Sequence, residues 1–236
     1  MRAQTLDALN QLHDRGMRLV LVTGRDLPDL RRVLPHLDRF DRIVAENGAL
    51  LFDPASDRQE LLGAPPPASF TQELERRGAS MLRLGRVIVA TRAPNEALLR
   101  EVIAEQALDL HVIRNGNARM VLPSAVDKGT GLEAAMRSLG IACEDVLAIG
   151  DGENDLPLLA TAGWRVAVAN AVPALAAMAH AVTHASRGQG VEEIVDAWLR
   201  GGDAWLRDGD AGLRDGDAWL RGGDAWLRGA RRRDSD

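Results

Sequence analysis

The segment 146–159 constrains the fold of this chain more than any other part of the sequence. Four apolar residues followed by a glycine predict a short strand that is buried on both faces, as in a parallel sheet. Three polar residues follow its carboxyl end, where open α/β sheets bind ligands: Asp151, Asn154 and Asp155. Two carboxylates and a carboxamide within five residues suit Mg²⁺. A helix N-cap is the alternative, but it explains one of these residues and not all three.

The same order of strand and helix recurs earlier in the chain. Apolar runs at residues 19–22 and 43–45 predict two further buried strands, and leucines at helical spacing predict helices before and after the first of them. Polar residues follow each strand, at 23–26 and 46–48. We therefore expect an α/β fold, a Rossmann-like doubly wound parallel sheet with its ligand site at the carboxyl ends of the strands.

The regular alternation is interrupted in the middle of the chain. Three prolines at residues 65–67 precede a predicted helix-strand-helix-strand-strand pattern, which indicates a small inserted α+β domain. The expected divisions are a first part of the core (1–49), the insert (50–123), a second part of the core (124–200) and a tail (201–236).

The tail is a near-perfect seven-residue repeat of the type DAWLRGG, which begins inside the last predicted helix. Its glycines argue against a coiled coil, because each one costs a helix about 1 kcal/mol relative to alanine. We expect residues 201–236 to be mostly disordered. An interaction tail that uses the tryptophans is the alternative.

Charge and composition exclude several classes of protein. A net charge of −5 over 236 residues gives no basic surface for nucleic acid. No apolar run approaches 18 residues, so we expect neither a membrane span nor a signal peptide. The single cysteine, Cys143, fits a reducing compartment, and we expect a cytoplasmic protein whose oligomeric state stays open.

Lys128 is the only lysine in the chain, beside 28 arginines. An ammonium is a compact point charge and a guanidinium is a wide planar fork, so the two are not interchangeable. Lys128 stands where a loop meets a predicted helix, a place that favours anions. We therefore expect a functional lysine here, and chance placement is the alternative.

Five polar segments, taken in order, resemble the haloacid dehalogenase superfamily of phosphatases, in its Cof-type branch (subfamily IIB). The segments are residues 21–25 (motif II), 46–49, Lys128 (motif III), 150–155 (motif IV) and 168–171. The resemblance implies that the insert is a cap domain between motifs II and III. It also implies a Mg²⁺-dependent phosphatase that acts on a small phosphorylated metabolite, such as phosphoglycolate or a sugar phosphate, through an aspartyl-phosphate.

The resemblance implies roles for individual residues. Asp151 would bind Mg²⁺ directly, and Asn154 and Asp155 would hold the metal or its waters. Thr23 and Lys128 would act in catalysis, and the groups that bind the phosphoryl oxygens would be Thr23, Gly24, Arg25 and Lys128. Candidates for substrate contact near the cap are Asn47, Arg86, His111 and Arg119, for which a solvated surface position is the alternative.

The chain departs from this family at motif I, Asp-x-Asp-Gly-Thr, which would supply the nucleophile at the end of the central strand. The sequence contains no such motif, and we nominate no other aspartate. Without that strand, the predicted strands 19–22 and 146–149 must pair directly or leave costly unpaired edges. We expect that the natural protein begins earlier and includes the motif. A non-catalytic relic that binds phosphate or a partner is the alternative.

A Gly-x-Gly at residues 150–152 allows a third hypothesis, a dinucleotide-binding domain. Two observations argue against it. The carboxylates of Asp151 and Asp155 would repel a pyrophosphate, and the third glycine of the fingerprint is absent.

Overall fold

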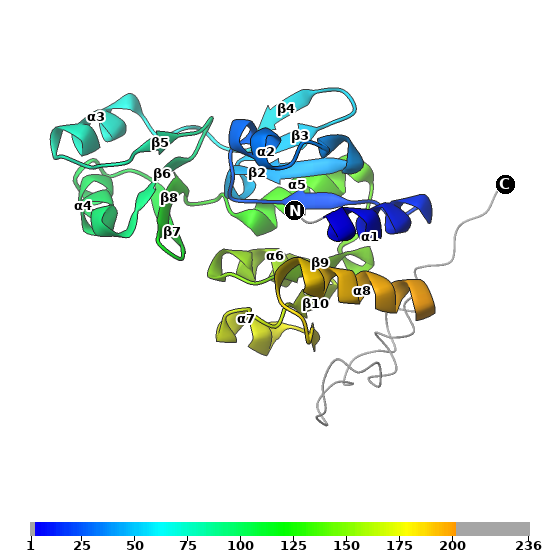
Figure 1. Cartoon of the computed structure of the whole chain (residues 1–236). Helices are drawn as coiled ribbons and strands as arrows, with labels where there is room; N and C mark the ends of the chain where they lie inside the picture. The colour runs from blue at the N-terminus through cyan, green and yellow to red at the C-terminus, as the bar shows by residue number, and fades with distance from the viewer. Residues whose placement is uncertain (1–2, 202–236) are drawn as a thin grey trace.

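Residues 3–201 are described by the computed structural model, and they form a core with a smaller cap beside it (Figure 1). The core contains two separate sheets. The first has the order β1-β2-β3-β4, with β1 and β2 parallel and the later pairs antiparallel. Its strands are β1 (Val20–Val22), β2 (Arg42–Ala45), β3 (Leu50–Asp53) and β4 (Arg58–Leu61).

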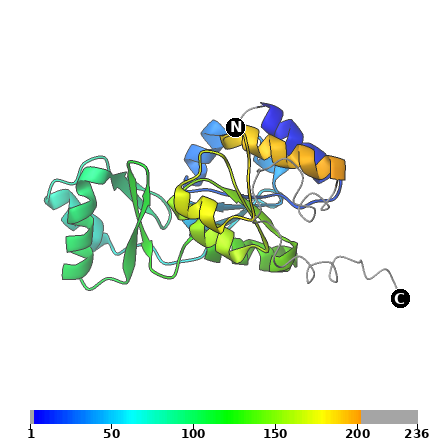
Figure 2. The ribbon, with the colours of Figure 1, turned by 90° about the horizontal axis from the view of Figure 1, so that it is seen from below.

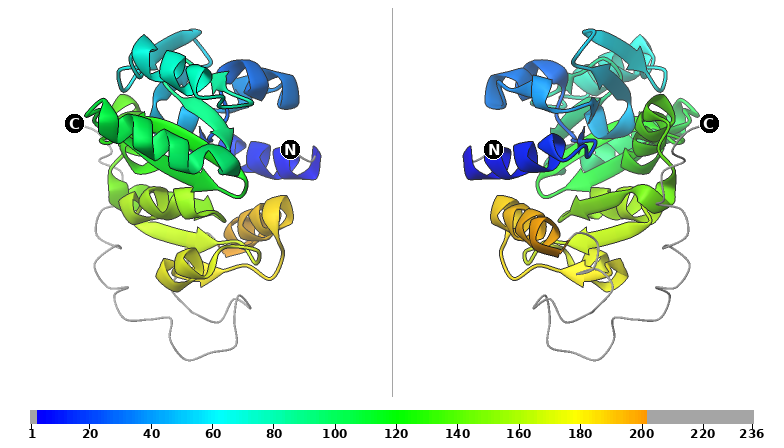
Figure 3. Two further views of the ribbon diagram at one scale, coloured as in Figure 1. Left: turned by 90° about the vertical axis from the view of Figure 1, so that its left-hand side faces the viewer. Right: turned by 90° about the vertical axis from the view of Figure 1, so that its right-hand side faces the viewer.

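The second core sheet is parallel throughout and has the order β11-β10-β9. Its strands are β9 (Leu147–Gly150), β10 (Trp164–Ala167) and β11 (Ala181–Val182). The core helices are α1 (Ala3–Asp14), α2 (Leu27–Val33), α5 (Lys128–Leu139), α6 (Leu156–Thr161), α7 (Pro173–Met178) and α8 (Arg187–Gly201). Helix α5 contacts both β1 and α6, and α1 contacts α8, so pairs of helices join the two sheets (Figure 3).

The cap is an antiparallel sheet of order β5-β6-β8-β7 with two helices packed on it (Figure 2). Its elements are α3 (Ala68–Arg76), β5 (Arg83–Leu84), β6 (Val89–Arg92), α4 (Glu96–Glu105), β7 (Leu110–Asn115) and β8 (Ala118–Pro123). Phe70 and Leu74 of α3 and Leu99 and Val102 of α4 are buried against Val121 of the sheet. The cap thus has its own apolar core, and the predicted α+β insertion is confirmed.

The insert starts later in the structure than the sequence analysis placed it. Residues 50–61 form β3 and β4, which extend the first core sheet, so the cap begins after Leu61. The sequence does not predict β4, because this strand is exposed along its whole length and carries no apolar alternation. The chain returns to the core through residues 124–127. Nearly all of the predicted tail lies outside the described part of the chain, because the structure does not describe residues 202–236.

The predicted α/β fold is confirmed, but the core has two sheets, one of them mixed, where the sequence predicts a doubly wound parallel sheet. Within residues 3–201, no strand pairs with the outer edge of β1 or of β9. These two strands therefore do not pair with each other, and the unpaired alternative holds. Val20 and Val22 nevertheless pack against the apolar cluster that contains Ala148 of β9. We call the space between the edges of β1 and β9 the seam.

Local capping explains where helix α5 begins and ends. The Asp127 carboxylate accepts the backbone N–H of Thr130, and Gly140 adopts a left-handed conformation (φ 67°) after the last turn. Short 3₁₀ helices connect other elements: η1 (Leu37–Arg39), η2 (Glu46–Gly48), η3 (Ala93–Asn95), η4 (Cys143–Asp145) and η5 (Glu153–Asp155).

In the described part of the chain, no helix has the length and apolar character needed to span a membrane.

Candidate active site

The loop after β1 lies at the carboxyl end of that strand, as the sequence predicts. The Thr23 N–H donates to the carbonyl of Val44 at 2.8 Å, which holds the loop against β2. A Cβ at Gly24 would lie 3.0 Å from the side-chain amide of Asn47, so a glycine allows the close approach of these two segments. The guanidinium of Arg25 is exposed and pairs with Asp29. Thr23 and Gly24 are therefore fixed in place, whereas Arg25 is engaged by α2.

Lys128 and Asp155 form a buried ion pair. Lys128 is the first residue of α5, and its Nζ lies 2.5 Å from Asp155 Oδ1. Only 8% of the Lys128 side chain and 9% of the Asp155 side chain are exposed. The single lysine of the chain is thereby held by Asp155 of the loop that follows β9.

Asp155 also shapes the loop that follows β9. Its Oδ2 accepts the backbone N–H groups of Asp151 and Gly152, both at 3.0 Å. A Cβ at Gly150 would lie 2.7 Å from the Asp155 Cβ, so this position has no room for a side chain. Both carboxylate oxygens of Asp155 are thus occupied by groups of the protein. Asp155 therefore connects Lys128 with the loop that follows β9.

Asp151 and Asn154 offer oxygen atoms to a cation. Asp151 is exposed at the end of β9, and Asn170 donates to its Oδ2 at 3.0 Å. Asn154 is buried, and its Oδ1 has no hydrogen-bond partner among the described residues. A buried acceptor without a donor, three residues from an exposed carboxylate, suits a hard cation such as Mg²⁺. In residues 3–201 no group of three or more His, Cys, Asp or Glu side chains could hold a metal ion, so these two donors give only part of a shell.

Asn47 is fully buried and connects the cap with motif IV. Its Oδ1 accepts from Asn154 Nδ2 at 2.9 Å, and its Nδ2 donates to Met120 Sδ of the cap at 2.8 Å. The family resemblance predicts that Asn47 contacts the substrate. In the structure its amide is engaged by the protein, so it orients Asn154.

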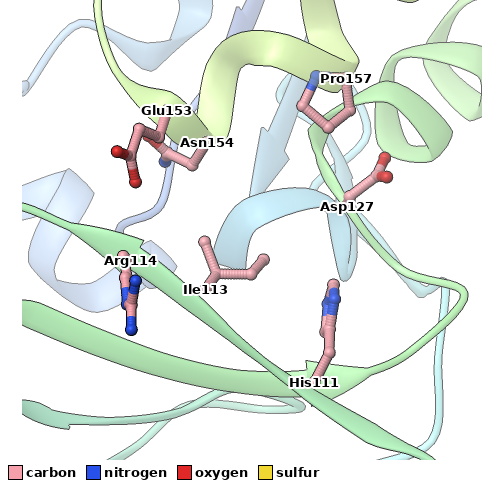
Figure 4. A pocket seen from close by; sticks show the side chains of 7 residues that line it. All are labelled: His111, Ile113, Arg114, Asp127, Glu153, Asn154 and Pro157. Carbon is pink, nitrogen blue, oxygen red and sulfur yellow. The ribbon is translucent and has the colours of Figure 1, made fainter. Parts of the chain in front are cut away.

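A cleft of about 260 Å³ separates β7 of the cap from the core (Figure 4). Its lining includes His111, Ile113 and Arg114 of β7, which lie opposite Glu153 and Asn154 of motif IV in the figure. The predicted residue His111 is therefore in the cleft, where its Nε2 lies 3.0 Å from the Val126 carbonyl. The sequence does not predict Arg114 or Glu153 as site residues, because they come together only where the cap lies beside the core.

Arg86 and Arg119 lie elsewhere and do not line the cleft. The Nε of Arg119 binds Glu96, at the start of α4, on the helix side of the cap sheet. Hydrogen bonds from Arg114 and Arg119 lower the pKa of Glu96 to about 2. Arg86 is exposed, and its guanidinium lies 3.4 Å from Gln59 Oε1. The structure thus places both predicted arginines in protein contacts and not beside the site.

Comparison with known proteins gives related sequences. The sequence model of the haloacid dehalogenase-like hydrolases matches residues 1–62 and 81–195. The chain is 34% identical over 203 residues to a phosphoglycolate phosphatase of Methanothermobacter thermautotrophicus, covering 83% of this chain and 90% of the relative. It is 35% identical over 194 residues to a phosphoglycolate phosphatase of Haloarcula marismortui, covering 78% and 85%.

Solved structures share the fold at lower identity. A protein of Thermoplasma acidophilum superposes with a TM-score of 0.71 at 16% identity, covering 84% of this chain and 90% of that one. A haloacid dehalogenase-like hydrolase from Bacteroides thetaiotaomicron gives 0.71 at 19% identity, covering 83% and 91%. A subclass IIB sugar phosphatase gives 0.68 at 18% identity, covering 85% and 91%. At these identities the likeness concerns the core and the inserted cap.

Proposed function

Because the chain belongs to the haloacid dehalogenase-like hydrolase family and is a phosphatase of that type, we propose that its substrate is 2-phosphoglycolate. The observation that carries the proposal is the 34% identity to a phosphoglycolate phosphatase over 90% of that protein's length. A small substrate also agrees with a cleft of about 260 Å³ between cap and core. The reaction would release glycolate and inorganic phosphate.

The phosphoryl group would bind at the carboxyl ends of β1 and β9. The Thr23 hydroxyl and the Gly24 N–H are donors on one side, and the Lys128 ammonium supplies positive charge on the other. Asp155 holds that ammonium in place. This arrangement neutralises an anion through groups that are already fixed before the substrate arrives.

Mg²⁺ would be held by Asp151 and by the unpartnered Oδ1 of Asn154, with water and substrate oxygens completing its shell. When bound, it would offset the negative charge of the phosphoryl oxygens. We leave Asp155 out of this shell, because Lys128 and two backbone N–H groups occupy its oxygens. Asn47 would aim the Asn154 oxygen by holding its amide nitrogen.

The nucleophile would be an aspartate on a strand that fills the seam. On either side of β1, the Leu19 carbonyl accepts the N–H of Asp41 and the Thr23 N–H donates to the Val44 carbonyl, so by alternation the backbone of Val20 and Val22 faces away from β2. The carbonyl of Val146, just before β9, and that of Gly150, at its end, accept N–H groups of Trp164 and Val168 on the β10 side. Both edges therefore turn backbone groups toward the seam, and a parallel strand there would end beside Thr23 and Asp151.

The chemistry would then follow two displacements. A carboxylate oxygen of that aspartate would form a bond to phosphorus while the bond from phosphorus to the glycolate oxygen breaks, and that oxygen would take up a proton from solvent. A water molecule would next attack the phosphorus of the aspartyl-phosphate and lose a proton to solvent. The bond from phosphorus to the aspartate oxygen would break, which releases inorganic phosphate and regenerates the carboxylate.

The test uses a chain that also supplies the Asp-x-Asp-Gly-Thr segment, with residues 1–236 alone as the control. It measures phosphate release from 2-phosphoglycolate, glucose 6-phosphate and 4-nitrophenyl phosphate, each with Mg²⁺ and with a chelator. We expect Mg²⁺-dependent release with kcat/KM for 2-phosphoglycolate at least about tenfold above the other two, a difference of about 1.4 kcal/mol in transition-state binding. Equal rates for all three would contradict the proposed substrate. Binding without release would support a second candidate, a phosphate-binding protein without turnover.

A further inference from the structure

The three residues after β2 form a buried left-handed turn. Their φ angles are 53° at Glu46, 54° at Asn47 and 110° at Gly48, and Glu46 and Asn47 are 1% and 0% exposed. Left-handed backbone is unfavourable for a glutamate, so surrounding contacts must hold it. We call residues 46–48 the left-handed turn.

Glu46 is the member of this turn that reaches into the cap. Its Oε1 accepts the N–H of Arg86 at 2.8 Å, and its Oε2 accepts those of Val87 at 2.8 Å and Ile88 at 2.9 Å. A Cβ at Gly85 would lie 2.6 Å from the Glu46 carboxyl carbon and Oε1. The loop 85–88 of the cap therefore wraps around one carboxylate of the core and has a glycine where the carboxylate needs space.

The other two members of the turn contact the active-site loops. Asn47 holds Asn154 of motif IV through its Oδ1. A Cβ at Gly48 would lie 1.8 Å from the carbonyl oxygen of Asp127, the residue before Lys128. One rigid turn thus contacts the cap, motif IV and the start of helix α5.

We propose that Glu46 is a positioning residue that latches the cap onto the core and sets the width of the substrate cleft. As a statement about catalysis, this rests on the phosphatase function proposed above. The latch itself is a contact between one carboxylate and three cap amides. The cap is otherwise joined to the core by the two chain connections at 62–67 and 124–127 and by side-chain contacts such as Asn47 with Met120.

Glu46→Gln tests the latch, because glutamine has nearly the same shape as glutamate but carries no negative charge. A glutamine oxygen can serve the amides of Val87 and Ile88, but its NH₂ then faces the N–H of Arg86, donor against donor. Hydrogen bonds to charged groups are stronger than neutral ones, so amide hydrogen exchange at residues 86–88 should become about tenfold faster or more. Glu60→Gln, the same change on the exposed strand β4, is the control and should leave these rates unchanged.

A double-mutant cycle and enzyme kinetics separate a latch from a general loss of stability. Gly85→Ala should displace the carboxylate, so its effect on exchange at 86–88 should be non-additive with that of Glu46→Gln. In the variants, KM for 2-phosphoglycolate should rise about tenfold or more while kcat changes less, because Lys128 and Asp151 stay on the core.

The outcomes are distinct. Faster exchange at 86–88, with rates in β10 and α8 within about twofold of the original, supports the latch. Unchanged exchange at 86–88, or equal acceleration across all three regions, overturns it. If local exchange behaves as expected but 2-phosphoglycolate is not hydrolysed by the chain that supplies the Asp-x-Asp-Gly-Thr segment, the proposed function fails and the latch stands.

Discussion

Replacing Asp155 with asparagine should reveal what the buried ion pair contributes to stability. Asparagine is nearly isosteric, and its Oδ1 can still accept the N–H groups of Asp151 and Gly152. Its NH₂ group then faces Lys128 Nζ, which lies 2.5 Å from the carboxylate in the original protein. The variant therefore isolates one change, a buried ammonium that loses its counter-charge.

The expected loss of stability in Asp155→Asn follows from the burial of the ion pair between Lys128 and Asp155. Exposed ion pairs contribute about 0–1 kcal/mol, but here 8% and 9% of the two side chains are exposed. Breaking a buried pair by removing one partner costs about 3–5 kcal/mol. For a domain of this size each kcal/mol shifts Tm by about 2–4 °C, so even the lower end predicts a fall of about 6–12 °C.

Thermal unfolding followed by circular dichroism measures this effect. Glu153→Gln, in the same loop but exposed, should change Tm by about 2 °C or less. The double variant Lys128→Met with Asp155→Asn should be more stable than Asp155→Asn alone, because it removes the uncompensated charge. A Tm of Asp155→Asn within about 2 °C of the original, or no recovery in the double variant, would refute the reasoning.

Three further predictions concern other parts of the chain. Asp151→Asn should lower Mg²⁺-dependent phosphate release about 100-fold or more while Tm moves by about 2 °C or less, since the carboxylate is exposed; a parallel loss of Tm would contradict a ligand role. Glu96→Gln should lower Tm at pH 7 but less so as pH falls. Because the arginines depress the folded pKa of Glu96 from 4.5 to about 2, its contribution is present above about pH 4.5 and is lost toward pH 2, and a pH-independent difference in Tm would argue against it. Gly48→Ala should prevent folding, measured by circular dichroism, because its Cβ would lie 1.8 Å from the Asp127 carbonyl at a φ of 110°; native-like spectra would refute this.

The sequence predicted the elements whose burial leaves a pattern. The apolar runs before Thr23 and before Asp151 form β1 and β9, and the predicted loop-to-helix start at Lys128 is the start of α5. Strand β3 is an exception, because it is buried and apolar and the sequence analysis still places it in the insert. Strand β4 is exposed along its length and carries no periodic signal. The two-residue strand β5 was missed for the same reason.

Side-chain partners across long sequence separations were harder to predict. Lys128 and Asp155 were each nominated, yet nothing in the sequence shows that they bind each other over 27 residues. Arg119 was placed near the substrate, but its register opposite Arg114 in the β7–β8 hairpin brings both side chains to Glu96. The family resemblance predicts which positions form the motifs. Only the structure shows that the carboxylate oxygens of Asp155 have partners within the protein, whereas Asn154 Oδ1 has none among the described residues.

Chemical labelling of Lys128 would report how often the site opens to solvent, because this side chain is buried. It is the only side-chain amine in the sequence, so an amine-directed acylating reagent has one target besides the terminal amino group. Because 8% of this side chain is exposed, the rate at which the protein gains the mass of one acyl group reports how often the site opens to solvent. Intact-mass spectrometry could follow ligand binding at this single residue without an added fluorophore.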